Sequence, residues 1–140
     1  SIFKKLTLRK IKCKKSRRTI LRNRYREEIK KISQKFDAIF QDAFSPRRNP
    51  ELWTVEWFKD LGDRSHSQTI LSTYSASERI RKSLMQSNWK LYAGAPFGAK
   101  RSATIAKREG PGDPAILEKL SLSSVNALTD EMIDEYRKIY

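Results

Sequence analysis

Residues 36–54 of the chain read FDAIFQDAFSPRRNPELWT. The first six of these residues are mostly apolar and have the pattern of a buried strand. An acid, Asp42, follows this run, and a loop rich in proline, aromatic and amide side chains comes after it. In α/β folds such loops lie at the carboxyl edge of the sheet, where ligands bind. The stretch therefore predicts an α/β fold with a site beside Asp42.

The pattern downstream of this stretch continues the alternation of helices and strands. Thr54 is placed to cap a helix to Leu61 that Gly62 ends in a left-handed conformation. Ser75-Ala76-Ser77-Glu78 has the form of a capping box. Further strands are expected over residues 68–74, 89–93 and 101–107, with a helix from the capping box to about residue 86. Glycine and proline lie between the last two strands, which predicts an antiparallel pair at the sheet edge.

The two ends of the chain differ from this central part. Residues 2–13 have an alternating pattern that fits a strand with a slip in it, and residues 16–33 fit an amphipathic helix. The Gly110–Pro114 cluster marks a boundary, residues 117–128 look irregular, and Thr129 caps a last helix. The sequence thus predicts a basic segment over 1–35, an α/β core over 36–109 and a C-terminal extension over 110–140.

The net charge of +14 is concentrated at the N-terminus. Residues 1–35 hold 15 of the 30 Lys and Arg residues and only two acids, Glu27 and Glu28. Such clustering favours a polyanion partner, most simply the phosphates of a nucleic acid. A solvated basic helix face is the alternative, and an anionic membrane surface fits less well because the helix has no Trp or Phe at its centre.

Several classes of protein and site find no support in the sequence. It has no apolar run near 18 residues and no pattern of a signal peptide. The single cysteine, Cys13, fits a reducing compartment, so we expect a cytoplasmic protein. We expect no metal site, because no cysteine and histidine residues have the spacing of zinc ligands. His66 lies in a polar stretch without an evident role.

The chemistry that a carboxylate permits at the end of a strand includes assistance to an amine nucleophile. When an amine accepts a methyl group its nitrogen becomes more positive, and a nearby carboxylate stabilises that charge and helps to direct the proton away. Asp42 has the position for this role, although an acid after a strand is more often a simple loop cap. Phe44, Trp53 and Tyr74 either wall a pocket for a base or belong to the core.

The same residues carry a resemblance to a known family. The elements are Asp42-Ala43-Phe44-Ser45-Pro46, then Asn49-Pro50 and Trp53-Thr54, followed by Ile70–Ser75, Arg81 with Leu84, and Gly98–Ala106. Over residues 36–106 the chain resembles the methyltransferase domain of the bacterial bifunctional enzymes that complete 5-methylaminomethyl-2-thiouridine at the tRNA wobble position. The resemblance implies the C-terminal half of a class I, Rossmann-like methyltransferase sheet with an antiparallel last strand pair.

The resemblance also implies roles for individual residues. It makes Asp42 the catalytic acid, S-adenosylmethionine the cofactor and tRNA the partner. By it, Gln41, Asp42 and Ala43 would contact the cofactor. The substrate-binding residues would be Phe44, Pro46, Asn49, Trp53, Tyr74, Lys100 and Arg101. For Asn49 the alternative is a helix cap, and for Lys100 and Arg101 it is solvated surface charge.

One part of the family pattern is missing from the sequence. The acidic-Gly-x-Gly turn that binds the cofactor in the family is not found, and Asn23-Arg24 stand where the family has Gly-Asp. Half a sheet would leave an edge and an apolar face exposed. We therefore expect a homo-oligomer or a partner chain that completes the sheet. A second hypothesis is a non-catalytic RNA-binding protein that retains a methyltransferase-like scaffold.

Overall fold

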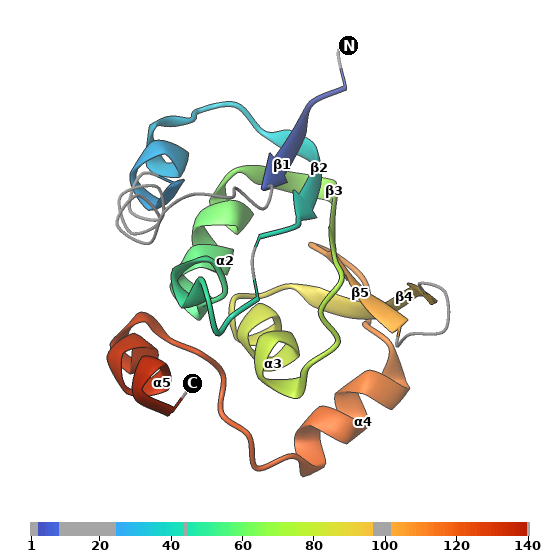
Figure 1. Cartoon of the computed structure of the whole chain (residues 1–140). Coiled ribbons are helices and arrows are strands. Elements are labelled where there is room, and N and C mark those ends of the chain that lie inside the picture. Colours follow the sequence, from blue (N-terminus) through green and yellow to red (C-terminus); the bar gives the residue numbers. More distant parts are fainter. Residues whose placement is uncertain (1–2, 9–24, 44, 97–101, 140) are drawn as a thin grey trace.

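The computed structural model describes residues 3–8, 25–43, 45–96 and 102–139, and these form a mixed sheet with helices (Figure 1). The sheet has five strands in the order β1-β2-β3-β5-β4. The strands are β1 (Lys5–Leu8), β2 (Phe36–Gln41), β3 (Ser65–Thr73), β4 (Lys90–Pro96) and β5 (Ser102–Lys107). The first three run parallel, and β5 is antiparallel to both β3 and β4. The predicted α/β class and antiparallel last pair are confirmed.

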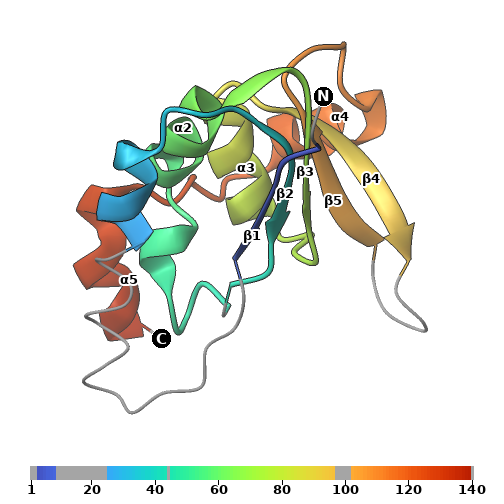
Figure 2. The ribbon, with the colours of Figure 1, turned by 90° about the horizontal axis from the view of Figure 1, so that it is seen from above.

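The helices between and after the strands cover one face of the sheet. They are α2 (Val55–Asp63), α3 (Glu78–Gln86), α4 (Pro114–Leu122) and α5 (Ile133–Ile139), with short 3-10 helices at Pro50–Leu52 and Asp130–Met132. Figure 2 shows α2, α3 and α4 together on one side of the five strands. The buried side chains Ile39, Leu71, Leu91 and Ala106 of the sheet meet those of the helices there. This single apolar layer is the core of the described part.

The opposite face of the sheet has no helix of the described residues on it (Figure 2). The strand register aligns one row of residues across it: Thr7, Phe40, Ser72, Ile105 and Tyr92. Phe40 and, in the next row, Ile70 are each 42% exposed. Contiguous apolar surface of this kind marks an interaction site or a ligand site.

Three predicted features of the helices are wrong. The capping box predicted over residues 75–78 would make Ser75 the cap, but the cap of α3 is Ser77, whose hydroxyl accepts from the Ile80 backbone N–H at 3.2 Å. Gly62 lies inside α2, and it is not among the glycines with a positive backbone φ. Its role is close packing, because a Cβ there would lie 2.9 Å from Arg108 Nη1. Residues 114–122 form α4, although the sequence looked irregular. The Asp113 side chain caps α4 and Pro114 occupies its first turn, so the breaker cluster starts a helix.

The extension after residue 110 shares the core of the α/β unit. Ile116, Leu120 and Leu128 are buried in the same apolar cluster as the sheet. The Arg26 guanidinium donates two hydrogen bonds to Asp130, at 2.9 and 2.7 Å. The residue 25–31 helix, the described part of the predicted basic helix, is thereby joined to the extension. Ion pairing of Arg137 with Glu51 attaches α5 to the loop after β2, residues 42–54, which we call the motif loop.

Replacement of Thr54 by Ala tests the start of α2. The Thr54 hydroxyl accepts a hydrogen bond from the Trp57 backbone N–H at 3.2 Å, and the side chain is fully buried. Loss of an N-cap of this type costs about 0.5–2 kcal/mol. We expect a lower urea midpoint for Thr54→Ala, whereas Thr54→Ser, which keeps the hydroxyl, should stay close to wild type. Equal midpoints for the two variants would contradict the capping role.

Candidate active site at the carboxyl ends of β2 and β3

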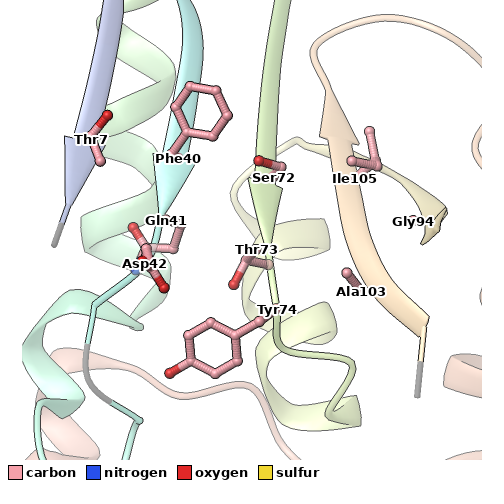
Figure 3. A pocket seen from close by; sticks show the side chains of 10 residues that line it. All are labelled: Thr7, Phe40, Gln41, Asp42, Ser72, Thr73, Tyr74, Gly94, Ala103 and Ile105. Carbon is pink, nitrogen blue, oxygen red and sulfur yellow. The ribbon is translucent and has the colours of Figure 1, made fainter. Parts of the chain in front are cut away.

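A cavity of about 640 Å³ lies over the open face of the sheet and reaches the ends of β2 and β3 (Figure 3). Its lining includes Phe40, Ser72 and Ile105 on the strands and Asp42, Thr73 and Tyr74 where two strands end. The volume lies within the roughly 300–1,000 Å³ of typical small-molecule sites. Apolar walls with a few polar groups at one end are also typical of such sites. The carboxyl ends of neighbouring parallel strands are where open α/β sheets bind ligands.

Asp42 is the acid of this cavity. It follows β2 directly, its side chain is exposed, and it lies at the end of the cavity beside Tyr74 (Figure 3). Its backbone N–H donates to Phe40 O at 3.0 Å, which makes a tight turn out of the strand. The predicted position of Asp42 at the rim of the sheet, after an extended segment, is therefore what the structure has. The carboxylate is accessible to a ligand in the cavity.

Tyr74 joins the two loops that leave the parallel strands. Its hydroxyl donates a hydrogen bond to Ala43 O at 2.9 Å, and its ring packs edge-on against Trp53 with centroids 5.7 Å apart. The residue is 41% exposed and lines the cavity. Burial raises the pKa of Tyr74 to about 12, and the negative charge of Asp42 adds to this effect. Tyr74 thus stays neutral and supplies an aromatic wall beside the carboxylate.

The alkaline titration of Tyr74 is a test of this geometry. We expect its phenol to ionise near pH 12, against about 10 for an exposed tyrosine. Because the folded-state pKa is the higher one, the stability linked to this proton is complete below about pH 10 and is lost as the pH rises through 12. The measurement is the tyrosinate absorbance of wild type minus that of Tyr74→Phe. The Asp42→Asn substitution should lower the Tyr74 pKa, and ionisation near 10 in wild type would contradict the packing.

Gln41 fixes the motif loop from inside the protein. Its side-chain amide donates to Leu52 O at 2.5 Å, and its carbonyl accepts from Trp57 Nε1 at 3.3 Å. The residue is 1% exposed. Both ends of the amide therefore hold the loop in place. A contact with a cofactor, as the resemblance implies for Gln41 and Ala43, would come from the backbone.

The other residues of the motif divide between the loop surface and the core. Pro46 is partly exposed on the loop. Asn49 precedes the 3-10 helix without capping it through its side chain, and its Oδ1 is buried with no hydrogen-bond partner among the described residues. Trp53 is fully buried. The ring of Trp53 thus supports Tyr74 from behind and does not face the cavity. Phe44, Lys100 and Arg101 lie outside the described residues.

A second layer of polar contacts was not found from the sequence. Arg81, in α3, is nearly buried and donates from Nε to Thr104 Oγ1 at 2.9 Å. Thr104 in turn donates to Ser75 O at 2.6 Å. This chain of bonds holds the segment after Tyr74 against β5. The sequence marks Arg81 only through the family pattern that it shares with Leu84, and an arginine on the apolar side of a helix often does no more than extend its charged end to solvent.

His66 also has a partner that the sequence did not indicate. Its Nε2 lies 2.8 Å from Asp37 Oδ1, and Asp37 Oδ2 accepts from the Lys4 backbone N–H at 2.7 Å. These hydrogen bonds, first the one from Lys4, lower the pKa of Asp37. The group lies at the amino ends of β2 and β3, away from the cavity. It connects three strands and is not part of the candidate site.

Metal sites and membrane spans are both absent from the part of the chain that the structure describes. In these residues no cluster of histidine, cysteine and acidic side chains could hold a metal ion. Over the same described ranges, no helix has the length and apolar character needed to cross a membrane.

Comparisons with known proteins agree with this geometry. The chain is 42% identical over 74 residues to the tRNA 5-methylaminomethyl-2-thiouridine biosynthesis bifunctional protein MnmC of Leptospira interrogans (strain Fiocruz L1-130), covering 53% of this chain and 11% of that protein. The protein of the same name from Hahella chejuensis is 34% identical over 87 residues, covering 61% and 14%. The chain thus spans a small fraction of the length of these relatives.

A solved structure and a family model extend the match. The crystal structure of MNMC2 from Aquifex aeolicus is 36% identical, with a TM-score of 0.66 over 78% of this chain and 37% of that one. The model of a family described as S-adenosyl-L-methionine-dependent methyltransferase matches residues 3–109. This range contains the sheet, the cavity and Asp42, and exceeds half of the chain. The chain therefore belongs to this family of S-adenosyl-L-methionine-dependent methyltransferases.

Proposed function

We propose that the chain forms the acceptor side of a methyl-transfer site that acts on the aminomethyl group of the modified wobble uridine of tRNA. The observation that carries the proposal is the exposed Asp42 carboxylate at the end of the 640 Å³ cavity, next to the neutral Tyr74. The relatives that share the motif around it are named for the synthesis of 5-methylaminomethyl-2-thiouridine in tRNA. A carboxylate beside an aromatic wall suits an amine carried on a base.

Asp42 acts on the nucleophile in this proposal. Its carboxylate accepts a hydrogen bond from the amine N–H, which turns the nitrogen lone pair toward the methyl donor. As the new bond forms the nitrogen becomes cationic, and the same carboxylate stabilises it and receives or directs the departing proton. Tyr74, held by Ala43 O, keeps its phenol neutral and excludes water from one side of the amine. The base itself would lie flat against the exposed side of the Tyr74 ring.

S-Adenosylmethionine supplies the electrophilic methyl group when bound. The cavity fits the methyl-bearing part of this cofactor, because it combines apolar walls, Phe40 and Ile105, with the Asp42 and Thr73 oxygens at one end. The cavity fits the amino-acid end of S-adenosylmethionine less completely. The family's glycine turn follows a strand, but the sequence after β1 contains no glycine before Gly62. The residues that would hold the cofactor here are those of the Gln41–Ala43 segment, which includes the Asp42 carboxylate.

Cofactor binding and methyl transfer test the proposal together. Calorimetry with S-adenosylmethionine and with its demethylated product should give a measurable heat, and labelled methyl groups should appear in tRNA that carries the aminomethyl group. Transfer to this tRNA but not to tRNA without the modification would support the substrate assignment. Cofactor binding without any transfer to the aminomethyl tRNA would contradict it.

The second candidate function is RNA binding without catalysis. It is favoured by the 15 Lys and Arg residues within residues 1–35. Under this function calorimetry with the cofactor gives no heat, while tRNA still binds. Both functions predict an affinity for tRNA that falls steeply as salt rises, because bound phosphates release counterions. A flat salt response would remove nucleic acid from both proposals.

The open face of the sheet supports the proposal that a second copy or a partner chain completes the domain. Phe40 and Ile70 are large apolar side chains at 42% exposure on a face that no described helix covers. Light scattering after size-exclusion chromatography would show a dimer for self-association. Phe40→Lys places a charge in the centre of the face and should return such a dimer to monomer. A monomer in both variant and wild type would exclude self-association.

A further inference from the structure

A second, smaller cavity lies between the loop after β2, the start of α3 and α5. It has a volume of about 180 Å³ and is lined by Pro46 and Arg47 of the loop, Ser77, Arg79 and Ile80 of the α3 region, and Tyr136 of α5. Liquid water occupies about 30 Å³ per molecule, so the space holds a small tetrahedral anion with part of its hydration shell. It is too small for a nucleoside, because small-molecule sites begin near 300 Å³.

Two guanidinium groups from separate elements line this cavity. Arg47 is exposed on the motif loop, and Arg79 comes from the first turn of α3. Arginine is the side chain best suited to phosphate, because its planar fork makes paired, charge-assisted hydrogen bonds. Two such groups on one small cavity make an anion the expected ligand.

Arg79 is held in position by the C-terminal extension. Its Nη1 donates to Asn126 O at 3.0 Å, and its guanidinium carbon lies 5.7 Å from the centre of the Tyr136 ring. The bond to Asn126 engages one of the five N–H groups of the guanidinium. The neighbouring acid, Glu78, accepts a hydrogen bond from the Ser123 hydroxyl at 2.6 Å. Asn126 and Tyr136 lie beyond residue 109, so this part of the cavity is outside the family match.

The small cavity and the candidate active site share the same two loops. Asp42 and Pro46 belong to the loop after β2, and Tyr74 and Ser77 belong to the segment after β3. The Tyr74 hydroxyl bond to Ala43 O joins these two loops. An RNA that places one base at Asp42 would meet the same two loops that carry the lining residues of the small cavity. Phosphate contacts of this kind fix the register of a nucleic acid without reading its sequence.

We infer that this cavity binds a backbone phosphate of the RNA whose base occupies the site at Asp42. The inference rests on the proposed RNA substrate and names a contact for it. The same chemistry would accept a free phosphate ion, so the test must separate the two sources. The RNA contact would set the position of the wobble nucleotide relative to the carboxylate.

The test measures the binding of unmodified tRNA to the full chain by fluorescence anisotropy over a range of salt concentrations. We expect the double variant Arg47→Gln/Arg79→Gln to bind tRNA about tenfold more weakly than wild type. The slope of log K against log salt should become shallower by roughly 0.7–0.9, which is the change expected for the loss of one phosphate contact. Arg48→Gln is the matched control, because Arg48 is exposed on the same loop but does not line the cavity. Its effect on the slope should be less than half that of the double variant.

Three outcomes overturn the inference. The first is a double variant with the same slope and affinity as Arg48→Gln. The second is a wild-type chain that binds inorganic phosphate in calorimetry and a double variant that does not, although the salt dependence of tRNA binding is the same for both. That result would assign the cavity to a free anion. The third is a wild-type chain that does not bind tRNA, which also removes the proposed substrate. Absence of heat with S-adenosylmethionine, in contrast, contradicts only the catalytic proposal.

Folding of the variants is checked by their urea midpoints. Arg79 also contacts Asn126 and Tyr136, so its replacement can destabilise the extension. The single variant Arg47→Gln, on an exposed loop, leaves those contacts in place. It should show a threefold or larger loss of tRNA affinity and a reduced slope at an unchanged midpoint. An unchanged affinity for this folded variant contradicts the inference.

Discussion

Asp42→Asn should lower the rate of methyl transfer to tRNA by about 10²- to 10⁴-fold, the range measured for loss of a positioned acid or base. The amide has nearly the same size and still fits at the end of β2, but it carries no negative charge. It can neither stabilise the cationic nitrogen nor receive its proton. Asp42 is exposed, so the substitution leaves no buried group without a partner. The measurement is the rate at saturating cofactor and tRNA.

Asp37→Asn is the matched control for this variant. Asp37 lies on the same strand but at its amino end, where it bonds to Lys4 and His66. Its substitution should change stability and leave the rate of transfer within a few fold of wild type. An Asp42→Asn protein that keeps more than a tenth of the wild-type rate would show that the carboxylate is not the acid of the reaction.

Trp53→Ala should produce the largest loss of stability among the motif residues, about 3–5 kcal/mol. The ring is fully buried and contacts Phe58 and Tyr74 edge-on, with centroids 6.4 and 5.7 Å away. Its removal leaves a cavity beneath the motif loop. Folded domains have only about 5–15 kcal/mol of stability in total. The expected result is therefore a large decrease in the urea midpoint, with partial unfolding at elevated temperature.

Trp53→Phe separates the loss of volume from the loss of an aromatic contact. It retains a ring against Tyr74 and should cost clearly less than Trp53→Ala. Since Tyr74 is held partly by this contact, Trp53→Ala should also bring the Tyr74 pKa down from about 12. A free energy change below about 1 kcal/mol for Trp53→Ala would contradict its place in the core, because large-to-small changes there cost more.

The sequence alone determined the class of the fold and the place of the acid. The apolar run Phe36–Gln41 is a strand, Thr54 caps the next helix, and the last two strands are antiparallel. These features depend on contacts between residues close together along the chain, so spacing and residue type suffice to predict them. The position of Asp42 follows in the same way, since a strand that ends must place its next residue at the rim.

Local patterns were insufficient where distant segments decide the structure. The Gly110–Pro114 cluster suggests a break where α4 begins, and only two side chains of α4, Ile116 and Leu120, are buried, so its helical pattern is weak. Gly62 was assigned to a helix end because the sequence does not show Arg108 packing against it. The motif aromatics looked alike, yet Trp53 is buried and Tyr74 faces the cavity.

The tertiary structure alone decided how the site is held together. Gln41 bonds to Trp57, Arg81 bonds to Thr104, and Arg79 is positioned by Asn126, across separations of 16, 23 and 47 residues. A polar side chain can satisfy its hydrogen bonds with many different partners, and only the folded chain selects one of them. The sequence therefore specified which residues are available for chemistry, and the packing of distant segments determined which of them meet.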